Sequence, residues 1–230
     1  MEINLNYPTS WEEVSREQLL IIAEHIIKRR TREEFLLEVF CKLTGIRIVL
    51  NCAEHSSEYK FAKGRKKFNI PLSTIRTACE ELSFLLEKTG LPESPILSVG
   101  TKLHGISFRQ YYFANAYFHR YQQTQEQNMM EQMHQALTGR KAHKISAGEV
   151  MAISIWWSGV QSFLKERYPG VFSDQEGEQT GSTPADTLQE ILSALNNNKP
   201  QENENILNSD MHAVLHALQH LYNQQKNDNS

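Results

Sequence analysis

Residues 107–121 read SFRQYYFANAYFHRY, and this stretch indicates what kind of fold the chain adopts. It opens with a Ser three residues before a Gln, a pair whose side chains satisfy free backbone N–H groups at a helix start. Seven aromatic residues follow, and at roughly 100° per residue they spread around the whole helix instead of along one stripe. A helix that is apolar all round is buried, so we expect this one at the centre of a mainly α-helical fold.

Further helix boundaries recur on both sides of this stretch. Ser or Thr three residues before Glu or Gln marks helix starts, and Gly after a helical run marks helix ends, because it adopts the left-handed conformation readily. The starts are Thr9, Ser10, Ser15, Thr31 and Ser146, and the ends are Gly45, Gly90, Gly139 and Gly170. These signals predict helices at about 11–29, 31–44, 72–89, 107–137 and 146–168, the first broken near Ser15.

Strand signals are few and short. Residues 46–50 are rich in β-branched side chains, and residues 59–61 and 66–70 flank a Lys63-Gly64 turn, which is typical of a hairpin. Ile3 and Leu5 alternate with polar neighbours. We therefore expect a mainly α fold with a minor antiparallel β-hairpin or small sheet.

The composition changes after Phe172. Residues 173–182 (SDQEGEQTGS) are polar and acidic and contain glycine, as flexible linkers do. Residues 183–230 then carry two short apolar stripes at helical spacing, with a second polar run at 196–205 between them. We expect a helical body over 1–172 with the small β element, a linker over 173–182 and tethered short helices over 183–230. Such helices bury little surface alone, so they would dock on the body, pair with each other or await a partner.

The composition also excludes several kinds of catalytic site. The first aspartate is Asp174, so residues 1–173 contain no Ser-His-Asp triad, aspartic dyad or EF-hand loop. The sequence has no P-loop, dinucleotide-binding glycine motif, HExxH helix or G-x-S-x-G elbow. Together these absences favour a non-catalytic protein without a cofactor.

The expected compartment is the cytoplasm, with reduced thiols. The cysteines Cys41, Cys52 and Cys79 are odd in number and widely spaced, unlike a disulfide framework. The N-terminal residues lack the basic and apolar regions of a signal peptide, and no uncharged run reaches the roughly 20 residues of a membrane span.

Histidine and cysteine spacings leave some chemistry open. His212, His216 and His220 recur one helical turn apart, a spacing that can chelate a transition metal. Cys52 and His55 are spaced like a zinc-ligand pair, and a cysteine with a histidine base could also be catalytic. No carboxylate lies on the helix edge of the three histidines, and Cys52 and His55 have no second ligand pair, so we expect no metal.

Five basic residues crowd the predicted hairpin turn, interleaved with aromatic residues. A basic β-ribbon of this kind can bind nucleic-acid phosphates, although lysines also protect exposed strand edges from aggregation. Nucleic-acid binding is therefore the alternative function, through Lys60, Lys63, Arg65, Lys66 and Lys67.

Flexible apolar side chains on two predicted helices are candidate contacts to a protein partner. Methionine adapts easily to different partner surfaces, and an apolar helix face can pair with a helix of another protein. The candidates are Met129, Met130, Met133, Met211, Leu215 and Leu218.

Four segments within residues 7–172 carry a resemblance to a known group of proteins. They read, in order, YPTSWEEVSREQLLIIAEHII, EEFLLEVFCKLTGI, SFRQYYFANAYFHRYQQT and WWSGVQSFLKERYPGVF. They resemble uncharacterised helical proteins from prophages and mobile elements of gut Bacteroidetes, and no catalytic motif is part of the match. In general character such proteins are similar to phage tail-assembly chaperones, which coat the tape-measure protein. The resemblance implies a non-catalytic assembly factor for a helical phage structural protein, with no membrane partner.

Overall fold

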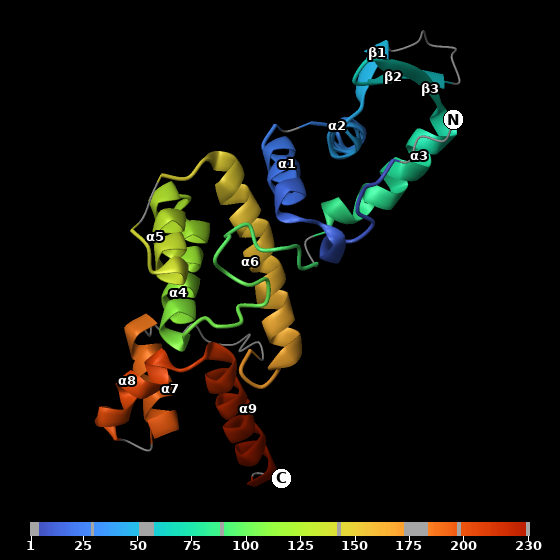
Figure 1. The fold of residues 1–230 in the computed structure, drawn as a ribbon. Helices are drawn as coiled ribbons and strands as arrows, with labels where there is room; N and C mark the ends of the chain where they lie inside the picture. Colours follow the sequence, from blue (N-terminus) through green and yellow to red (C-terminus); the bar gives the residue numbers. More distant parts are fainter. Residues whose placement is uncertain are drawn as a thin grey trace. The chain divides into compact units, whose positions relative to one another are not determined.

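The structure, a computed structural model, describes residues 5–28, 30–50, 58–87, 90–141, 144–172, 184–196 and 199–228. Within these ranges the fold is mainly α-helical with one small antiparallel sheet, as the sequence predicts (Figure 1). The predicted linker at 173–182 lies outside the described residues, as do Ile3, Cys52 and His55.

The chain forms two compact units, and each is built from two separate stretches of chain. Unit 1 comprises Met1–Pro95 and Ser146–Gly159, and unit 2 comprises Ile96–Ile145 and Val160–Ser230. This division differs from the expected body with a tethered tail, because the helices after residue 183 belong to unit 2.

Unit 1 begins with helices whose ends follow the local sequence signals. A 3-10 turn, η1 (Trp11–Glu13), precedes α1 (Arg16–Ile26), so the predicted break near Ser15 is confirmed. Helix α2 (Arg32–Thr44) also starts with a capping box, and it ends at Gly45 with a left-handed φ of 70°. The core of unit 1 includes fully buried apolar residues of both helices, among them Leu19, Ile22, Val39 and Phe40.

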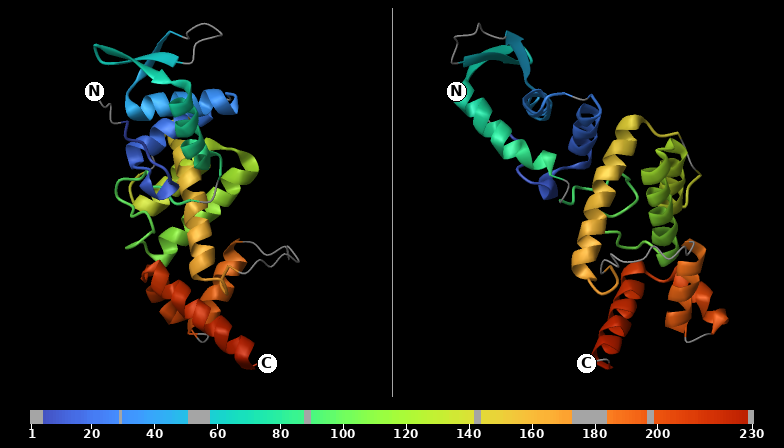
Figure 2. Two further views of the ribbon diagram at one scale, coloured as in Figure 1. Left: turned by 90° about the vertical axis from the view of Figure 1, so that its right-hand side faces the viewer. Right: turned by 180° about the vertical axis from the view of Figure 1, so that it is seen from behind.

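The sheet follows α2 and has the order β1-β2-β3. Its strands are β1 (Arg47–Leu50), β2 (Glu58–Lys63) and β3 (Lys66–Pro71), all antiparallel, with β2 in the centre. The predicted hairpin is thus confirmed. Helix α3 (Leu72–Glu81) and a 3-10 turn, η2 (Leu82–Leu86), leave the sheet from β3 (Figure 2).

Helix α6 (Ala147–Arg167) contributes its first thirteen residues to unit 1. Its start is fixed by Ser146 and Glu149, since the Glu149 carboxylate accepts from the Ser146 N–H at 2.7 Å. Gly159 lies so close to Gly90 that a Cβ at position 159 would be 2.3 Å from the Gly90 carbonyl oxygen. Only glycine fits at this contact, because real Cβ atoms do not approach a backbone oxygen so closely.

Unit 2 contains a helical hairpin where the sequence predicted one helix over 107–137. Helix α4 (Phe108–Thr124) ends at Gln125, which has a left-handed φ of 57°, and α5 (Gln127–Thr138) follows. The two helices lie side by side (Figures 1 and 2). The side-chain amide of Gln110, near the start of α4, donates to the Leu137 carbonyl near the end of α5 at 3.0 Å. The single-helix prediction was therefore wrong. The expected burial all round the helix is not seen either, because α4 buries one face and Phe113 is 44% exposed.

The C-terminal helices are part of unit 2. They are α7 (Pro184–Asn196), a 3-10 turn η3 (Pro200–Glu202), α8 (Asn203–Asn208) and α9 (Met211–Asp228). The polar run 196–205, expected to be a linker, is thus partly helical. Backbone bonds of 2.9 Å join Phe108 N–H to the Ser209 carbonyl and Met211 N–H to the Ile106 carbonyl. The segment before α9 is therefore held by the segment before α4.

Candidate functional site

The structure places four of the six candidate partner-binding residues inside unit 2. Met130, Met133, Met211 and Leu215 are buried, while Met129 and Leu218 are half-buried. The reason is packing within the chain: α5 folds back on α4, and α9 docks beside α4. In this arrangement these four side chains are not free to contact another protein.

His212 fixes the start of α9 through both of its ring nitrogens. Its Nε2 lies 2.7 Å from the Lys102 carbonyl oxygen, and its Nδ1 lies 2.9 Å from the Tyr168 hydroxyl. A carbonyl only accepts, so Nε2 donates to it, and in a neutral ring Nδ1 then accepts from Tyr168. His216 and His220 are exposed. Within the described ranges there is no group of three or more His, Cys, Asp or Glu side chains that could hold a metal ion.

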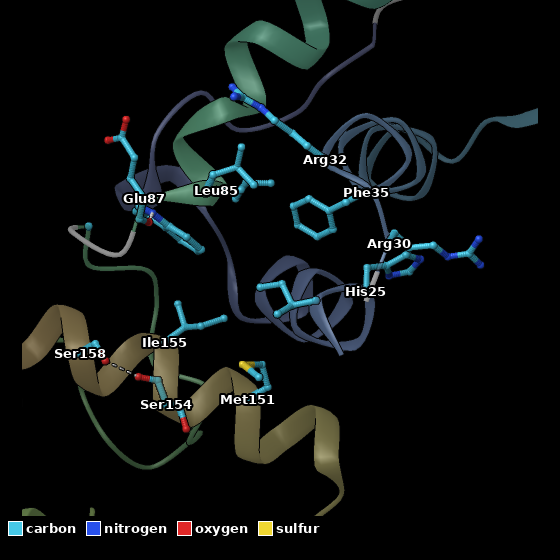
Figure 3. Close-up of a pocket in the computed structure, with 14 residues that line it drawn as sticks. His25, Arg30, Arg32, Phe35, Leu85, Glu87, Met151, Ser154, Ile155 and Ser158 are labelled. Carbon is cyan, nitrogen blue, oxygen red and sulfur yellow. Dashed lines mark hydrogen bonds between the residues drawn. The ribbon is translucent and has the colours of Figure 1, made fainter. Parts of the chain in front are cut away.

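A cavity of about 420 Å³ in unit 1 is the candidate binding site (Figure 3). Its walls come from α1, α2, η2 and the first part of α6 together with η1, and most of them are apolar. In the close-up, Phe35, Leu85, Met151 and Ile155 point toward the space between these elements. The volume falls in the range of roughly 300–1,000 Å³ that is usual for binding pockets.

The aromatic part of the wall is fixed in place by Trp11. Its indole N–H donates to the Glu87 carbonyl at 2.9 Å, and its ring meets Phe84 edge-on with centroids 5.5 Å apart. Gly90 packs directly against it, since a Cβ at position 90 would be 2.1 Å from the Trp11 Cβ. The wall therefore has a defined shape before any ligand binds.

The polar groups that line the cavity are largely engaged by their own helices. The Ser154 and Ser158 hydroxyls donate to the carbonyls of Val150 and Ser154 at 2.8 and 2.9 Å. The His25 Nδ1 lies 2.8 Å from the Ile21 carbonyl, so it donates there. Hydroxyls bonded to their own helix offer no proton to a ligand, and the interior is suited to apolar groups.

Positive charge lies at the rim of the cavity. Arg30 and Arg32 both border it, with Glu87 as an acidic neighbour. In Figure 3 the charged ends of Glu87, Arg30 and Arg32 all point away from the apolar space. Arg30 is 3.3 Å from Glu38, whereas Arg32 is exposed and makes no ion pair with any residue that the structure describes. The rim therefore favours a ligand with acidic groups beside its apolar part.

The cysteines that the structure describes have raised pKa values. Burial, with a smaller contribution from neighbouring Cys79, raises the pKa of Cys41 to about 11. Burial also raises the pKa of Cys79, which is half-buried. A catalytic thiol needs the opposite shift, because the thiolate is the nucleophile.

We expect slow alkylation of Cys41 in the folded protein. Below its pKa of about 11, the thiolate fraction falls about tenfold per pH unit, so iodoacetamide should label Cys41 at least about tenfold more slowly than in urea. Cys79, being partly accessible, should react faster than Cys41. Mass spectrometry of the labelled peptides measures both rates, and equal rates for Cys41 in folded and unfolded protein would contradict the burial.

The five candidate nucleic-acid contacts are all exposed. Lys60 and Lys63 lie on β2, Arg65 lies in the turn, and Lys66 and Lys67 lie on β3. None of the helices in the described ranges combines the length and apolar content that a bilayer span requires.

Comparisons with protein-family models, with curated proteins and with solved structures find no match to this chain. The geometry of the cavity and of the hairpin is therefore what supports a function.

Proposed function

We propose that this protein is a non-catalytic assembly factor whose unit 1 cavity accepts apolar side chains from a helix of a partner protein. The observation that carries the proposal is the apolar cavity of about 420 Å³, framed by helices and open to solvent. Leu86, at its border, is 43% exposed, although large apolar side chains usually avoid water. Contact with a partner would cover it.

A helix suits the cavity better than a small polar ligand does. Small-molecule sites combine apolar walls with a few polar groups that converge on the ligand, whereas here the Ser154 and Ser158 hydroxyl protons are already bonded to their own helix. An amphipathic helix needs only an apolar groove for side chains spaced three or four residues apart. The exposed Arg32 at the rim then favours acidic residues flanking that apolar stripe.

A tail-assembly chaperone is the narrower form of this proposal. A long helical structural protein presents many apolar stripes before it is assembled, and covering them prevents association with the wrong partner. In this form of the proposal the cavity of unit 1, rather than the last helix, holds the partner. Met211 and Leu215 of α9 are buried within the chain.

The test replaces Leu86 with Glu in the full chain. A carboxylate at the cavity border would be buried against the apolar face of the partner, so we expect binding to weaken at least about tenfold, which is about 1.4 kcal/mol. Because Leu86 is exposed in the free protein, the thermal unfolding temperature should hardly change. Partners are captured from the native host with tagged protein and quantified by mass spectrometry.

Leu97→Glu provides the matched control. Leu97 is 83% exposed, belongs to unit 2 and is not one of the residues that line the cavity, so this variant introduces the same charge without changing the cavity lining. It should capture partners as the unmodified protein does. Equal capture by Leu86→Glu and Leu97→Glu would rule out the cavity as the partner site, and capture of nucleic acid alone would rule out the assembly-factor function.

A further inference from the structure

The β2–β3 hairpin carries an excess of positive charge. Residues 58–71 contain five basic residues and one acidic residue, Glu58. The Glu58 carboxylate accepts a hydrogen bond from the Asn69 side chain at 2.9 Å. Among the described residues, no ion pair within 4.0 Å involves any of the five basic side chains.

Protection of a strand edge explains only part of this charge. Lysines on an edge strand discourage pairing with other chains, and β3, with Lys66 and Lys67, is an edge strand. Strand β2 is central, and Lys60 is paired with Leu50 on one side and Asn69 on the other. Lys60 therefore has no free edge to protect.

The register distributes the lysines over both faces of the hairpin. Lys63 is directly opposite Lys66, and these two share a face with the stacked pair Phe61 and Phe68. Side chains alternate between faces along a strand, so Lys60 and Lys67 lie on the other face. Like charges directly opposite each other destabilise a hairpin slightly, and a bound anion between them would remove that cost.

The turn of the hairpin is open at Gly64, whereas Lys63 beside it lies near the end of α2, since a Cβ added to Gly45 would be 4.0 Å from the Lys63 Cε. Gly64 has a left-handed φ of 60°, and a Cβ added to it would meet no atom within 4 Å. Arg65 follows it in the same turn and is exposed. Phe61, which is fully buried, and Phe68 stack with centroids 6.4 Å apart, so the strands behind the turn are well supported.

We propose that the β2–β3 hairpin binds double-stranded DNA by entering the major groove, with cations on its two faces contacting phosphates on both walls. Beyond Ala62, which pairs with Arg47 of β1, only β2 and β3 continue, and a two-stranded β-ribbon fits the major groove of B-form DNA, which is about 12 Å wide. Cations on two faces and at the turn suit a groove with two charged walls, whereas a flat anionic membrane would contact one face. The deep, narrow major groove of A-form RNA does not admit side chains in the same way.

The contacts are to the DNA backbone, so binding does not depend on base sequence. Lysine contacts to phosphates position a protein without reading bases. They also release bound counterions. The logarithm of the association constant therefore falls linearly with the logarithm of the salt concentration, with a slope of roughly 0.9 per phosphate contact. This proposal rests on the hairpin alone and is independent of the cavity in unit 1.

The experiment measures binding of the full-length protein to a labelled DNA duplex of about two helical turns, by fluorescence anisotropy between about 50 and 200 mM salt. Two variants each remove one pair of lysines from one face: Lys63→Gln with Lys66→Gln, and Lys60→Gln with Lys67→Gln. Each should weaken binding at least about tenfold and lower the salt slope by about two. The matched control, Lys141→Gln with Lys144→Gln, removes two exposed lysines of unit 2 and should bind as the unmodified protein does.

Several results would overturn the proposal. One is no duplex binding at about 50 mM salt, and another is a loss with only one of the two lysine pairs, which would mean contact through one face. Tighter binding to phosphatidylserine vesicles or to an RNA duplex of the same sequence would do so as well. If a Gln variant unfolds, Lys63→Arg with Lys66→Arg keeps the charge and must bind. Leu86→Glu, which alters the cavity, should retain DNA binding. Failure of the DNA-binding proposal can therefore be distinguished from failure of the proposed partner binding at the cavity.

Discussion

Replacing Leu215 with Asp is expected to destabilise unit 2 by about 4 kcal/mol or more, since a carboxyl group would be buried among apolar side chains. Leu215 is 2% exposed on α9, and the segment before it is held by backbone bonds to residues 106–108. Urea unfolding followed by circular dichroism measures the loss. We expect a lower midpoint or a separate early transition for this unit.

Ala217→Asp is the matched control for this prediction. Ala217 lies on the same helix and is exposed, so the substitution adds the same charge and costs only helix propensity, at most about 0.7 kcal/mol. If Leu215→Asp and Ala217→Asp unfold at the same urea concentration, then α9 is not part of the core. It would then be available to a partner, as the sequence alone suggested.

Gly159→Ala is expected to destabilise unit 1 by at least about 2 kcal/mol. The new methyl group would lie 2.3 Å from the Gly90 carbonyl oxygen and 3.0 Å from the Leu91 Cα. Both are backbone atoms, so the helix or the 90–91 segment must move, and Trp11, which packs against Gly90, must move with it. Thermal unfolding measures the loss, and the tryptophan emission, to which Trp11, Trp156 and Trp157 all contribute, should shift in wavelength.

Gly148→Ala makes the same substitution at the start of the same helix. Its Cβ would be 3.1 Å from the Glu24 Cγ, which belongs to an exposed, flexible side chain that can move aside. Alanine favours a helix over glycine by up to about 1 kcal/mol, so this variant should be as stable as the unmodified protein or more stable. Equal losses in Gly148→Ala and Gly159→Ala would show that the contact with Gly90 is looser than the structure indicates.

Helix and strand boundaries set by neighbouring residues were predictable from the sequence. The capping boxes at Ser15 and Thr31 form as expected, and α2 ends at Gly45. The hairpin around Gly64 also forms where it was expected. Each of these features depends on hydrogen bonds or backbone angles within a few residues, which is the range that a sequence pattern reports.

Features that depend on distant contacts were not predictable in the same way. Gln125 takes a left-handed conformation, which non-glycine residues rarely adopt, and no Gly or Pro announces the break between α4 and α5. The helical hairpin of α4 and α5 is held by contacts such as the hydrogen bond between Gln110 and Leu137, 27 residues away. Likewise, the apolar stripe of α9 looks the same whether it packs on its own chain or on another protein.

The two candidate sites differ in how far the sequence could reveal them. The charge of the β2–β3 hairpin is contiguous in sequence, so it was visible at once, and only its division between two faces required the strand register. The cavity brings together residues as distant as Trp11, Leu85 and Ile155. In the sequence, adjacent apolar residues such as Leu85 and Leu86 only weakly indicate a cavity border, since one of two neighbours on a turn usually faces water.

The discontinuous make-up of unit 1 has a consequence for synthesis on the ribosome. The cavity wall formed by Met151 and Ile155, and the contact of Gly159 with Gly90, cannot form until α6 has been made. At about 5–20 residues per second, the first 95 residues wait roughly 3–13 seconds for it. During that interval the cavity residues Ile26 and Phe35 lack the wall that α6 supplies, so apolar surface of the nascent chain is exposed to other proteins. A fragment that ends between residues 95 and 146 would lack this wall of the cavity.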